Sequence, residues 1–563
     1  MKHVTGSKRI KATILSLSLA AALIVPNGTA LEAAKKPAMV KKSVNVKVGN
    51  TTKVKLKNVS KKATVKWSSK ASKTAKVVKS AKTYAKIKGV KEGKTKISAK
   101  IKQPGFKKTL TCTVNVKPKD TAATSEPATT APTSVPATTA PTTAPTTAPA
   151  NTTPTADPNA AKSTEAPTPT PEVTIGPDKW VTTWGTAEEK NDISADSAMP
   201  KIPLADSTIR QIIRITTSGT KIKFRLSNQY GASDVVVKSM HIAKQVQPDK
   251  STIDPSTDTV ITVDGQEEFT IPSKQLIETD GIDFDAKALD NIAVSMYFES
   301  APTSNITGHR GARATTYQIA GDHVSDETIT TEHKPTSWFF LADCSLMSPG
   351  DSRAVVCFGD SITDGYGTDA SYLGKKPDSY TRWGDYFAKR LQANEKTQHV
   401  SVINEGIGAN SILGSYPTDA GKDRFERDLT QHDGVEYCII LFGVNDLNHL
   451  GDTSKFDQLL PEYKKMIELC HDNGIKVYGA PILPFGTSDY YSEASEEVRT
   501  KINTWMRNTE ESELDGIIDF ESAVADPDDP IKVKNEYTHD DGLHPYDGYD
   551  VMANAIDLTM FEK

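Results

Sequence analysis

The chain has 563 residues and a formal net charge of −3. It is too long for one hydrophobic core and is predicted to contain three or four domains. The small net charge hides a strong asymmetry, because residues 35–120 hold about 27 lysines against Glu92 and Asp120, so a basic module precedes an acidic body. Nucleic acid is a poor partner for this module, which has one Trp and one Tyr, Trp67 and Tyr84, for base stacking.

The N-terminus, residues 1–34, has the pattern of a secretory signal peptide. Basic residues up to Lys11 precede an apolar run at 12–25 and then small residues. This predicts bacterial-type export and a secreted or surface-associated protein without a membrane span after cleavage. An uncleaved anchor is the alternative, although the run is shorter than the roughly 20 residues that a span needs.

Residues 37–118 alternate apolar and polar residues, as in Val44–Gly49 and Lys96–Ile101, which predicts a β-sandwich of short strands. The pattern VKVGNTTKVKL, followed by VKWSSK and IKGVKEGKTKISAKI, resembles the bacterial Ig-like domain of group 2. The resemblance implies a surface spacer or adhesion module. Its lysines form either a solvated face or a contact for anionic cell-wall polymers or polyanionic glycans.

Residues 119–177 are rich in Thr, Pro and Ala and are predicted to be an extended linker. Residues 178–348 contain several strand patterns and no long helical one, which predicts a β-sandwich accessory domain. The stretch Trp180–Gly185, with Ser227–Gly231, resembles the domain that precedes some secreted esterases close to acetylxylan esterases. Trp180 and Trp184 are either core residues or a platform for sugar rings.

Residues 349–563 alternate between strand and helix patterns, which predicts a three-layer α/β domain with a parallel sheet. The predicted strands are Ala354–Phe358, Val400–Asn404, Tyr437–Phe442, Ile475–Ala480 and Gly516–Phe520. The predicted helices are Thr381–Gln392, Phe456–Asn473, Ser495–Arg507 and Tyr549–Leu558.

Two short motifs in this region supply the groups for nucleophilic acyl transfer. The run 359–365, GDSITDG, places Ser361 on a glycine-flanked turn after a strand, and the run 541–545, DGLHP, supplies Asp541 and His544. A histidine can accept the serine proton, and a carboxylate can fix the histidine tautomer. Either motif alone is weak, because a Gly-Asp-Ser turn and an Asp-x-x-His pair are both common.

Two further motifs lie between them in the chain. The run 404–410, NEGIGAN, and the run 443–446, GVND, each follow an apolar strand pattern. A backbone N–H of the first and the Asn445 amide of the second are suitable donors for an oxyanion. Ordinary strand-to-helix loops also contain Gly and Asn, but four such segments in this order argue against that explanation.

These four blocks resemble those of the SGNH (GDSL-type) hydrolase superfamily. The resemblance implies that Ser361 is the nucleophile and an oxyanion donor, that Asn445 is a second donor, and that His544 is the base oriented by Asp541. The second-block glycine of the family falls on Ala409, preceded by Gly408. A backbone donor survives this change if Ala409 keeps a negative φ.

The remaining polar residues are assigned lesser roles. Asp360 and Asp364 are predicted to stabilise the turn, and Cys357 and Cys438 are predicted to be packing residues. His539, Asp540, Asp541 and His544 do not have the spacing of a common zinc site, so neither a metal nor an organic cofactor is expected.

The expected function is that of a secreted serine esterase that removes O-acetyl groups from a polysaccharide or oligosaccharide such as xylan. A lipase, lysophospholipase or broad carboxylesterase is the alternative within enzymes. A cell-surface adhesin with an inert hydrolase domain is the alternative outside them.

Overall fold

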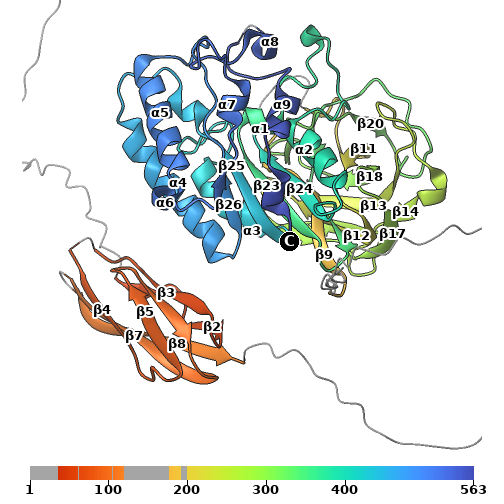
Figure 1. The fold of residues 1–563 in the computed structure, drawn as a ribbon. Helices are drawn as coiled ribbons and strands as arrows, with labels where there is room; N and C mark the ends of the chain where they lie inside the picture. Colours follow the sequence, from red (N-terminus) through yellow and green to blue (C-terminus); the bar gives the residue numbers. More distant parts are fainter. Residues whose placement is uncertain (1–35, 61, 104–105, 119–175, 192–198, 540) are drawn as a thin grey trace, which may run out of the picture. The chain divides into compact units, whose positions relative to one another are not determined.

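The computed structural model describes residues 36–60, 62–103, 106–118, 176–191, 199–539 and 541–563 (Figure 1). Contacts divide the chain into two compact units, residues 1–161 and 162–563. The predicted signal peptide and almost all of the predicted linker lie outside the described residues. No helix in the described part of the chain is long and apolar enough to cross a membrane.

The first unit contains two four-stranded sheets, ordered β1-β3-β6-β5 and β2-β8-β7-β4. Its strands are β1 (Ala38–Met39), β2 (Ser43–Lys47), β3 (Thr51–Lys57), β4 (Thr64–Ser69), β5 (Ala75–Ser80), β6 (Tyr84–Gly89), β7 (Gly93–Gln103) and β8 (Phe106–Lys117). Val54, Ile87, Ile97 and Val114 share one core between the sheets. The alternating pattern therefore produces a β-sandwich, and its identity as a group 2 Ig-like domain stays a prediction.

The second unit begins with antiparallel sheets. Their strands are β9 (Lys179–Gly185), β10 (Glu189–Lys190), β11 (Ser207–Arg214), β12 (Gly219–Ser227), β13 (Val235–Lys244), β14 (Thr259–Val260), β15 (Phe269–Ile271), β16 (Leu276–Glu278), β17 (Ile282–Ala286), β18 (Asn291–Ser300), β19 (Thr307–His309), β20 (Thr316–Ala320), β21 (Trp338–Phe339) and β22 (Leu341–Ser348). The sheet β14-β13-β18-β11-β20 packs on the sheet β16-β12-β22-β9, and Ile213, Phe224 and Met296 lie in their common core. We call residues 178–348 the accessory sandwich.

A five-stranded parallel sheet follows, in the order β24-β23-β25-β26-β27. Its strands are β23 (Arg353–Gly359), β24 (Val400–Gly406), β25 (Val435–Leu441), β26 (Lys476–Gly479) and β27 (Gly516–Ile517). Every residue of β23 is buried, because helices cover both faces of the sheet. Continuous apolar runs of this kind are typical of parallel strands.

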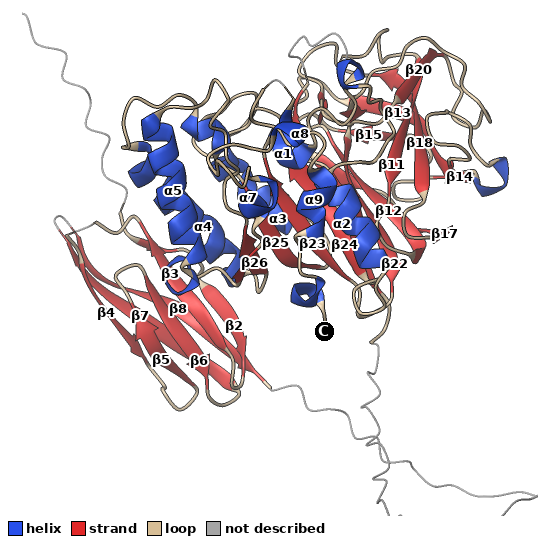
Figure 2. Cartoon of the chain, turned by 45° about the horizontal axis from the view of Figure 1, so that its top comes forward, coloured by secondary structure: helices blue, strands red, loops and turns tan. Residues whose placement is uncertain are grey.

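The helices of this domain form two groups. They are α1 (Ser361–Asp364), α2 (Trp383–Gln392), α3 (Gly421–Thr430), α4 (Lys455–Asp472), α5 (Glu493–Arg507), α6 (Thr509–Ser512), α7 (Phe520–Val524), α8 (Asn535–Thr538) and α9 (Tyr549–Asn554). On one face Phe358 packs on Phe425 of α3, with ring centroids 4.7 Å apart. On the other, Tyr437 packs on Phe561, which contacts Phe387 of α2. Figure 2 shows α2 and α9 lying over one face of the sheet. With helices on both faces, the predicted three layers are confirmed.

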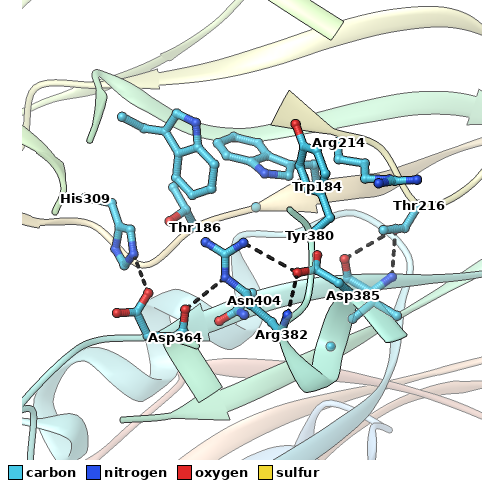
Figure 3. A pocket seen from close by; sticks show the side chains of 14 residues that line it. Trp184, Thr186, Arg214, Thr216, His309, Asp364, Tyr380, Arg382, Asp385 and Asn404 are labelled. Atoms are coloured by element: carbon cyan, nitrogen blue, oxygen red, sulfur yellow. Dashed lines mark hydrogen bonds and ion pairs between the residues drawn. The ribbon is translucent and has the colours of Figure 1, made fainter. Parts of the chain in front are cut away.

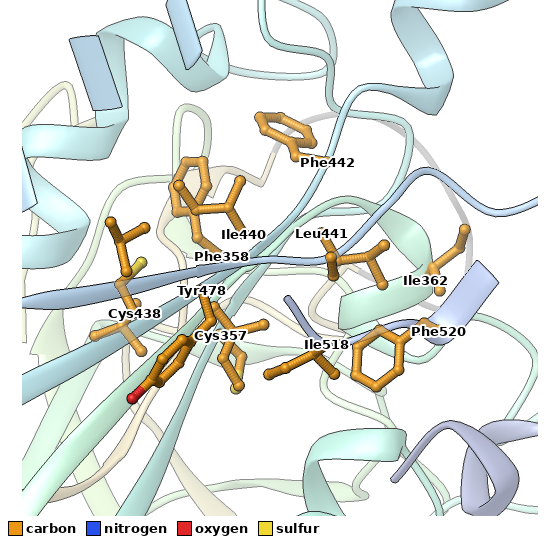
Figure 4. Close-up of a cluster of buried hydrophobic side chains, with 14 of the residues drawn as sticks. Cys357, Phe358, Ile362, Cys438, Ile440, Leu441, Phe442, Tyr478, Ile518 and Phe520 are labelled. Carbon is orange, nitrogen blue, oxygen red and sulfur yellow. The ribbon is translucent and has the colours of Figure 1, made fainter. Parts of the chain in front are cut away.

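The core of the parallel sheet includes two cysteines. Cys357 and Cys438 lie among Phe358, Ile440 and Tyr478 (Figure 4), as predicted for packing residues. All five cysteines of the chain are buried and free. Burial raises the pKa of the Cys357 thiol, which makes it a poor nucleophile.

The accessory sandwich packs on the edge strand of the parallel sheet. Strand β9 lies beside β24, where Thr186 forms a parallel bridge with Asn404. Val181 of β9 joins the core of the α/β domain. Arg225 also pairs with Asp433 at 3.0 Å. The two domains therefore share one continuous interior within the second unit.

Candidate active site

Ser361 stands at the point where the central strand of the sheet becomes a helix. Strand β23 ends at Gly359, and Ser361 is the first residue of α1. The carboxylate of Asp360 caps this helix by accepting the N–H of Ile362 at 3.0 Å. Burial raises the pKa of Asp360 to about 7. Asp360 therefore stabilises the turn, as predicted, that places Ser361 just beyond the strand end, where parallel sheets bind ligands.

The structure brings Ser361, His544 and Asp541 into one hydrogen-bonded chain. The Ser361 Oγ lies 2.8 Å from Nε2 of His544, and Nδ1 of His544 lies 2.6 Å from Oδ2 of Asp541. Oδ1 of Asp541 also accepts the N–H groups of Leu543 and His544, at 2.9 and 3.0 Å. This is the arrangement in which a histidine acts as the base for a serine.

The carboxylate of Asp541 is held in its ionised form. Its partial burial opposes ionisation, but hydrogen bonds from His544 and Tyr546 outweigh this effect. Together they keep the pKa of Asp541 well below its usual range. Asp541 can therefore stabilise an imidazolium on His544.

Asn445 and Ala409 lie in the same cleft as Ser361. Nδ2 of Asn445 donates to the carbonyl of Asn410 at 2.8 Å, and the hydroxyl of Tyr490 donates to Oδ1 at 3.0 Å. One hydrogen of the Asn445 amide remains for a ligand, because an NH₂ group has two.

The condition set for Ala409 is not met. Its φ is 64°, in the left-handed region that favours glycine, whereas a negative φ was the condition under which Ala409 would keep the donor role. Ala409 therefore carries backbone strain in a conformation that a glycine adopts freely. Ala409 and Gly408 both line the cleft.

The cleft has a volume of about 390 Å³ and is built by both domains of the second unit. Glu189, Arg310 and Arg313 of the accessory sandwich line it together with Ser361 and His544. The sequence motifs did not indicate this contribution, because these three residues lie far from the four blocks along the chain and in no recognisable pattern.

Asp364, at the end of α1, is the anchor between the two domains. Its Oδ2 lies 2.7 Å from Nη2 of Arg313. Its Oδ1 lies 3.1 Å from Nε2 of His309, a contact that Figure 3 shows. Burial alone would raise the pKa of Asp364, but Arg313 and His309 hold it well below its usual range. Gly311 permits this approach, because a Cβ there would lie 2.3 Å from the Asp364 carboxylate oxygens. Asp364 was predicted to stabilise a turn, and the structure adds an interdomain ion pair to that role.

A second, small cavity of about 50 Å³ lies between the accessory sandwich and the α/β domain. Trp184, Arg214, Tyr380 and Arg382 are among its lining residues (Figure 3). It contains neither Ser361 nor His544, but Asp364 borders both this cavity and the catalytic cleft. The cavity is large enough for water and too small for an ester substrate.

Arg424 of α3 is a further residue that the sequence did not reveal. Its guanidinium donates to the carbonyls of Gly359 and Glu405, both at 3.0 Å, and to Oδ1 of Asn410 at 2.9 Å. It is fully buried beside Asp428, at 2.7 Å. Arg424 therefore ties the strand end before Ser361 to the loop that receives the Asn445 amide.

Two other interpretations concern Trp184 and the residues around His539. Trp184 is 6% exposed and packs edge to face on Trp338, with centroids 4.9 Å apart, so it is a core residue and not a sugar platform.

His539 pairs with Asp547 at 2.6 Å, and Asp540 lies outside the described residues. Among the residues that the structure describes, no group of three or more His, Cys, Asp or Glu has the arrangement of a metal site.

Comparison with known proteins agrees with this geometry. Residues 357–549 match the GDSL-like Lipase/Acylhydrolase family, so the chain contains a GDSL-like lipase/acylhydrolase domain. A search of curated proteins gives no match.

Several solved structures are similar to this chain at low identity. A carbohydrate acetylesterase from Sinorhizobium meliloti is 18% identical, with 36% of this chain and 95% of that chain covered and a TM-score of 0.28. An acetylxylan esterase from Geobacillus stearothermophilus, solved as a catalytic mutant, is 18% identical, with 36% and 91% covered and a TM-score of 0.28. A family two carbohydrate esterase from Cellvibrio japonicus is 12% identical, with 68% and 97% covered and a TM-score of 0.29.

Proposed function

We propose that the protein is a serine esterase that removes short acyl groups, above all O-acetyl groups, from polysaccharides or oligosaccharides such as xylan. The observation that carries the proposal is the hydrogen-bonded chain Ser361–His544–Asp541, which opens into the catalytic cleft. The match of residues 357–549 to an acylhydrolase family supports the reaction class.

The reaction follows from the geometry. Ser361 Oγ attacks the ester carbonyl while His544 takes its proton at Nε2, and Asp541 stabilises the imidazolium through Nδ1. The Ser361 N–H, the Asn445 amide and a backbone N–H at 408–409 stabilise the oxyanion. His544 then protonates the leaving alcohol, and a water molecule releases the acyl group from Ser361.

The lining of the cleft favours a small acyl group and a polar alcohol. Ala409 and Leu543 supply the only aliphatic side chains among the described residues that line it, whereas Arg310, Arg313 and Glu189 are charged. A long acyl chain gains its binding energy by burial against apolar surface, at about 25 cal/mol per Å². The scarcity of aliphatic side chains in the cleft therefore argues against a lipase.

The test is the release of acetate from acetylated xylan by the purified chain, compared with hydrolysis of medium-chain and phospholipid esters. We expect acetate release to dominate, and we expect Ser361→Ala to reduce turnover by a factor on the order of 10⁴ or more with the fold intact. Faster hydrolysis of medium-chain or phospholipid esters would favour the lipase. A folded chain that hydrolyses none of these esters would be an adhesin with an inert domain.

We also propose that the protein is exported and that its basic module contacts anionic cell-wall polymers or polyanionic glycans. The N-terminal sequence pattern supports export. Lysines such as Lys86, Lys88 and Lys100 are exposed on the strands of the module and alternate with buried residues. A face of this kind presents cations without using them in the core.

A further inference from the structure

We propose that Tyr366, Tyr372 and Tyr546 form an aromatic ridge that binds sugar rings on the leaving-group side of the catalytic cleft. We further propose that the saccharide chain continues over this ridge into a neighbouring polar cavity. This inference rests on the proposed function and identifies its substrate as an oligomeric or polymeric saccharide ester.

The leaving group of the ester must lie beside His544, because this residue protonates the departing oxygen. The ring of Tyr366 lies next to it, with centroids 4.6 Å apart. Tyr366 lines the cleft and is 41% exposed. An exposed aromatic side chain therefore stands where the alcohol part of the substrate has to be.

The position of Tyr366 relative to the nucleophile is fixed by its backbone. Its N–H donates to the carbonyl of Ser361 at 2.8 Å, and its own carbonyl accepts the hydroxyl of Tyr549 at 3.0 Å. The guanidinium of Arg313, from the accessory sandwich, lies 5.7 Å from the centre of the Tyr366 ring. The platform is thus held by both domains, and little conformational freedom is lost when a ligand binds.

Two more tyrosines extend the platform. The Tyr546 ring lies 6.2 Å from that of Tyr366, and its hydroxyl donates to Asp541. Gly367 leaves room for this contact, because a Cβ there would lie 2.2 Å from the Tyr546 ring. Tyr372 contributes to the raised pKa of both Tyr366 and Tyr546, which places it near the two rings, and it is 71% exposed. The three rings therefore form one ridge, which is most exposed to solvent at Tyr372.

The ridge connects the catalytic cleft to a second hollow of about 450 Å³. Tyr546 lines this second hollow and contacts Tyr366, which lines the cleft. Lys375, Ser379 and Asp547 are among the polar groups that line it, and Lys375 pairs with Asp547 at 2.8 Å.

This combination of groups matches a saccharide chain. The C–H faces of a sugar ring pack on aromatic rings, and its hydroxyls need donors and acceptors such as those of Lys375, Ser379 and Asp547. An acyl chain or lipid tail would instead have to displace water from the Lys375–Asp547 ion pair without replacing its hydrogen bonds, which is unfavourable. A single acetylated sugar would fill the cleft and leave the second hollow unused.

The test compares three acetate esters that differ in the alcohol: ethyl acetate, an acetylated xylose, and acetylated xylo-oligosaccharides of increasing length. The wild-type chain should show a kcat/KM that rises with saccharide length. Tyr372→Ala should lower the ratio of kcat/KM for the oligosaccharide to that for ethyl acetate by about three- to tenfold, mainly through KM, since one aromatic contact is lost. Tyr372→Phe keeps the ring and should retain most of the ratio.

Tyr416→Ala is the control, because Tyr416 is similarly exposed, at 64%, but lies in the loop before α3 and not in the segment that carries Tyr366 and Tyr372. It should keep the wild-type ratio, and the unfolding temperatures of the variants should agree. Non-acetylated xylo-oligosaccharides should also inhibit ethyl acetate hydrolysis more weakly in Tyr372→Ala than in the wild type.

The outcomes separate this inference from the proposed function. An unchanged ratio in Tyr372→Ala, an equal loss on every ester, or the same fall in Tyr416→Ala would overturn the ridge. A wild-type chain that hydrolyses acetylated xylose as well as the oligosaccharides would overturn the extended path while leaving the esterase in place. A wild-type chain that hydrolyses ethyl acetate but no saccharide ester would remove the saccharide substrate and the ridge together.

Discussion

The side-chain amide of Asn445 is oriented by partners at both of its ends. Asn410 accepts one Nδ2 hydrogen and Tyr490 donates to Oδ1, which leaves the second Nδ2 hydrogen for an oxyanion. We expect Asn445→Ala to lower kcat by about 10²–10³, because one donor is lost while the hydrogen-bonded chain at Ser361 remains. Steady-state kinetics on a soluble acetate ester will measure this.

Tyr490→Phe is the matched control for this prediction. It removes the bond that orients Oδ1 but leaves Nδ2 in place, so its effect on kcat should be smaller than that of Asn445→Ala. An unchanged kcat in Asn445→Ala would mean that this amide does not contact the oxyanion.

For Ala409 we predict a substitution that raises the free energy of unfolding. Its φ of 64° places an alanine in a conformation that costs an L-residue roughly 1–2 kcal/mol. Ala409→Gly removes this strain but adds freedom to the unfolded chain worth about 0.4–1 kcal/mol. The variant should therefore gain on the order of 0.5–1 kcal/mol in free energy of unfolding and remain active, as measured by denaturant unfolding and ester hydrolysis. A clear loss of stability would show that the alanine methyl group makes favourable contacts that outweigh the strain.

Within the α/β domain, helix α1 carries Ser361 at its start and Asp364 at its end, so whatever holds Asp364 also positions the nucleophile. Arg313 of the accessory sandwich pairs with Asp364 at 2.7 Å and with Asp369 at 3.2 Å. We expect Arg313→Ala to lower kcat by up to about 10²-fold, because small displacements of a catalytic group have effects of this size. The loss should fall on kcat for every ester, including ethyl acetate, since the helix serves the chemical step.

Arg225→Ala is the control for Arg313→Ala. Arg225 also joins the two domains, through Asp433 at 3.0 Å, but it does not contact α1. This variant should lose stability and keep most of its kcat at a temperature where it is folded. Equal losses of kcat in the two variants would show that the interface acts as a whole and that Arg313 has no particular role in positioning Ser361.

The elements of the α/β domain were predictable to different degrees. Strand β23 was found because it is buried on both faces and is therefore continuously apolar. Helix α3 was missed because its sequence, GKDRFERDLT, is highly charged and suggests an exposed segment. In the structure Arg424 and Asp428 turn inward and form a fully buried pair, which hydrophobic periodicity cannot reveal.

The candidate site was predictable where its residues follow strand ends in fixed motifs. Ser361 and Asn445 could be placed together because parallel strands end at one edge of the sheet, and His544 was added from the DGLHP motif. Arg313 and His309 could not be, because the contact with Asp364 depends on how two separate domains pack. The left-handed φ of Ala409 likewise depends on the loop geometry and not on the identity of the residue.

At the scale of the whole second unit, a buried histidine makes the domain interface sensitive to pH. His432 lies 2.9 Å from both Asp343 of the accessory sandwich and Glu405 of β24. Burial disfavours the imidazolium, but the hydrogen bonds and charges of Asp343 and Glu405 outweigh burial and raise the pKa of His432 to about 10. Its unfolded pKa is about 6.5.

A raised pKa means that the folded state binds the proton more tightly than the unfolded state does. The stabilisation from His432 is therefore complete below about pH 6.5 and declines as pH rises from there to about 10. The unfolding temperature of the second unit, followed by calorimetry, should fall between pH 7 and 9.5. His432→Gln cannot be protonated, so its unfolding temperature should be lower near neutral pH and should fall less over this range. Equal slopes for the two proteins would show that His432 is neutral in the folded state.

The contacts across the second unit also predict where the chain can be shortened. All residues that line the catalytic cleft lie between Glu189 and His544, within the second unit. A chain of residues 178–563 should therefore hydrolyse ethyl acetate as fast as the full chain. A chain of residues 349–563 should be poorly active and unstable, because it loses Arg313 and Val181 and exposes the edge strand β24.

Comparing the full chain with residues 178–563 also separates catalysis from adhesion. The full chain, and not residues 178–563, should bind anionic wall material or polyanionic glycans, because the exposed lysines belong to the first unit. Binding should weaken as salt is added, since exposed charges are screened beyond a Debye length of about 8 Å at physiological ionic strength. Salt-insensitive binding would indicate specific pockets in place of a charged face, and equal binding by the shortened chain would assign adhesion to the second unit. If the chain of residues 349–563 proved as active as the longer ones, the accessory sandwich would have no part in positioning Ser361, and Arg313→Ala should then be harmless as well.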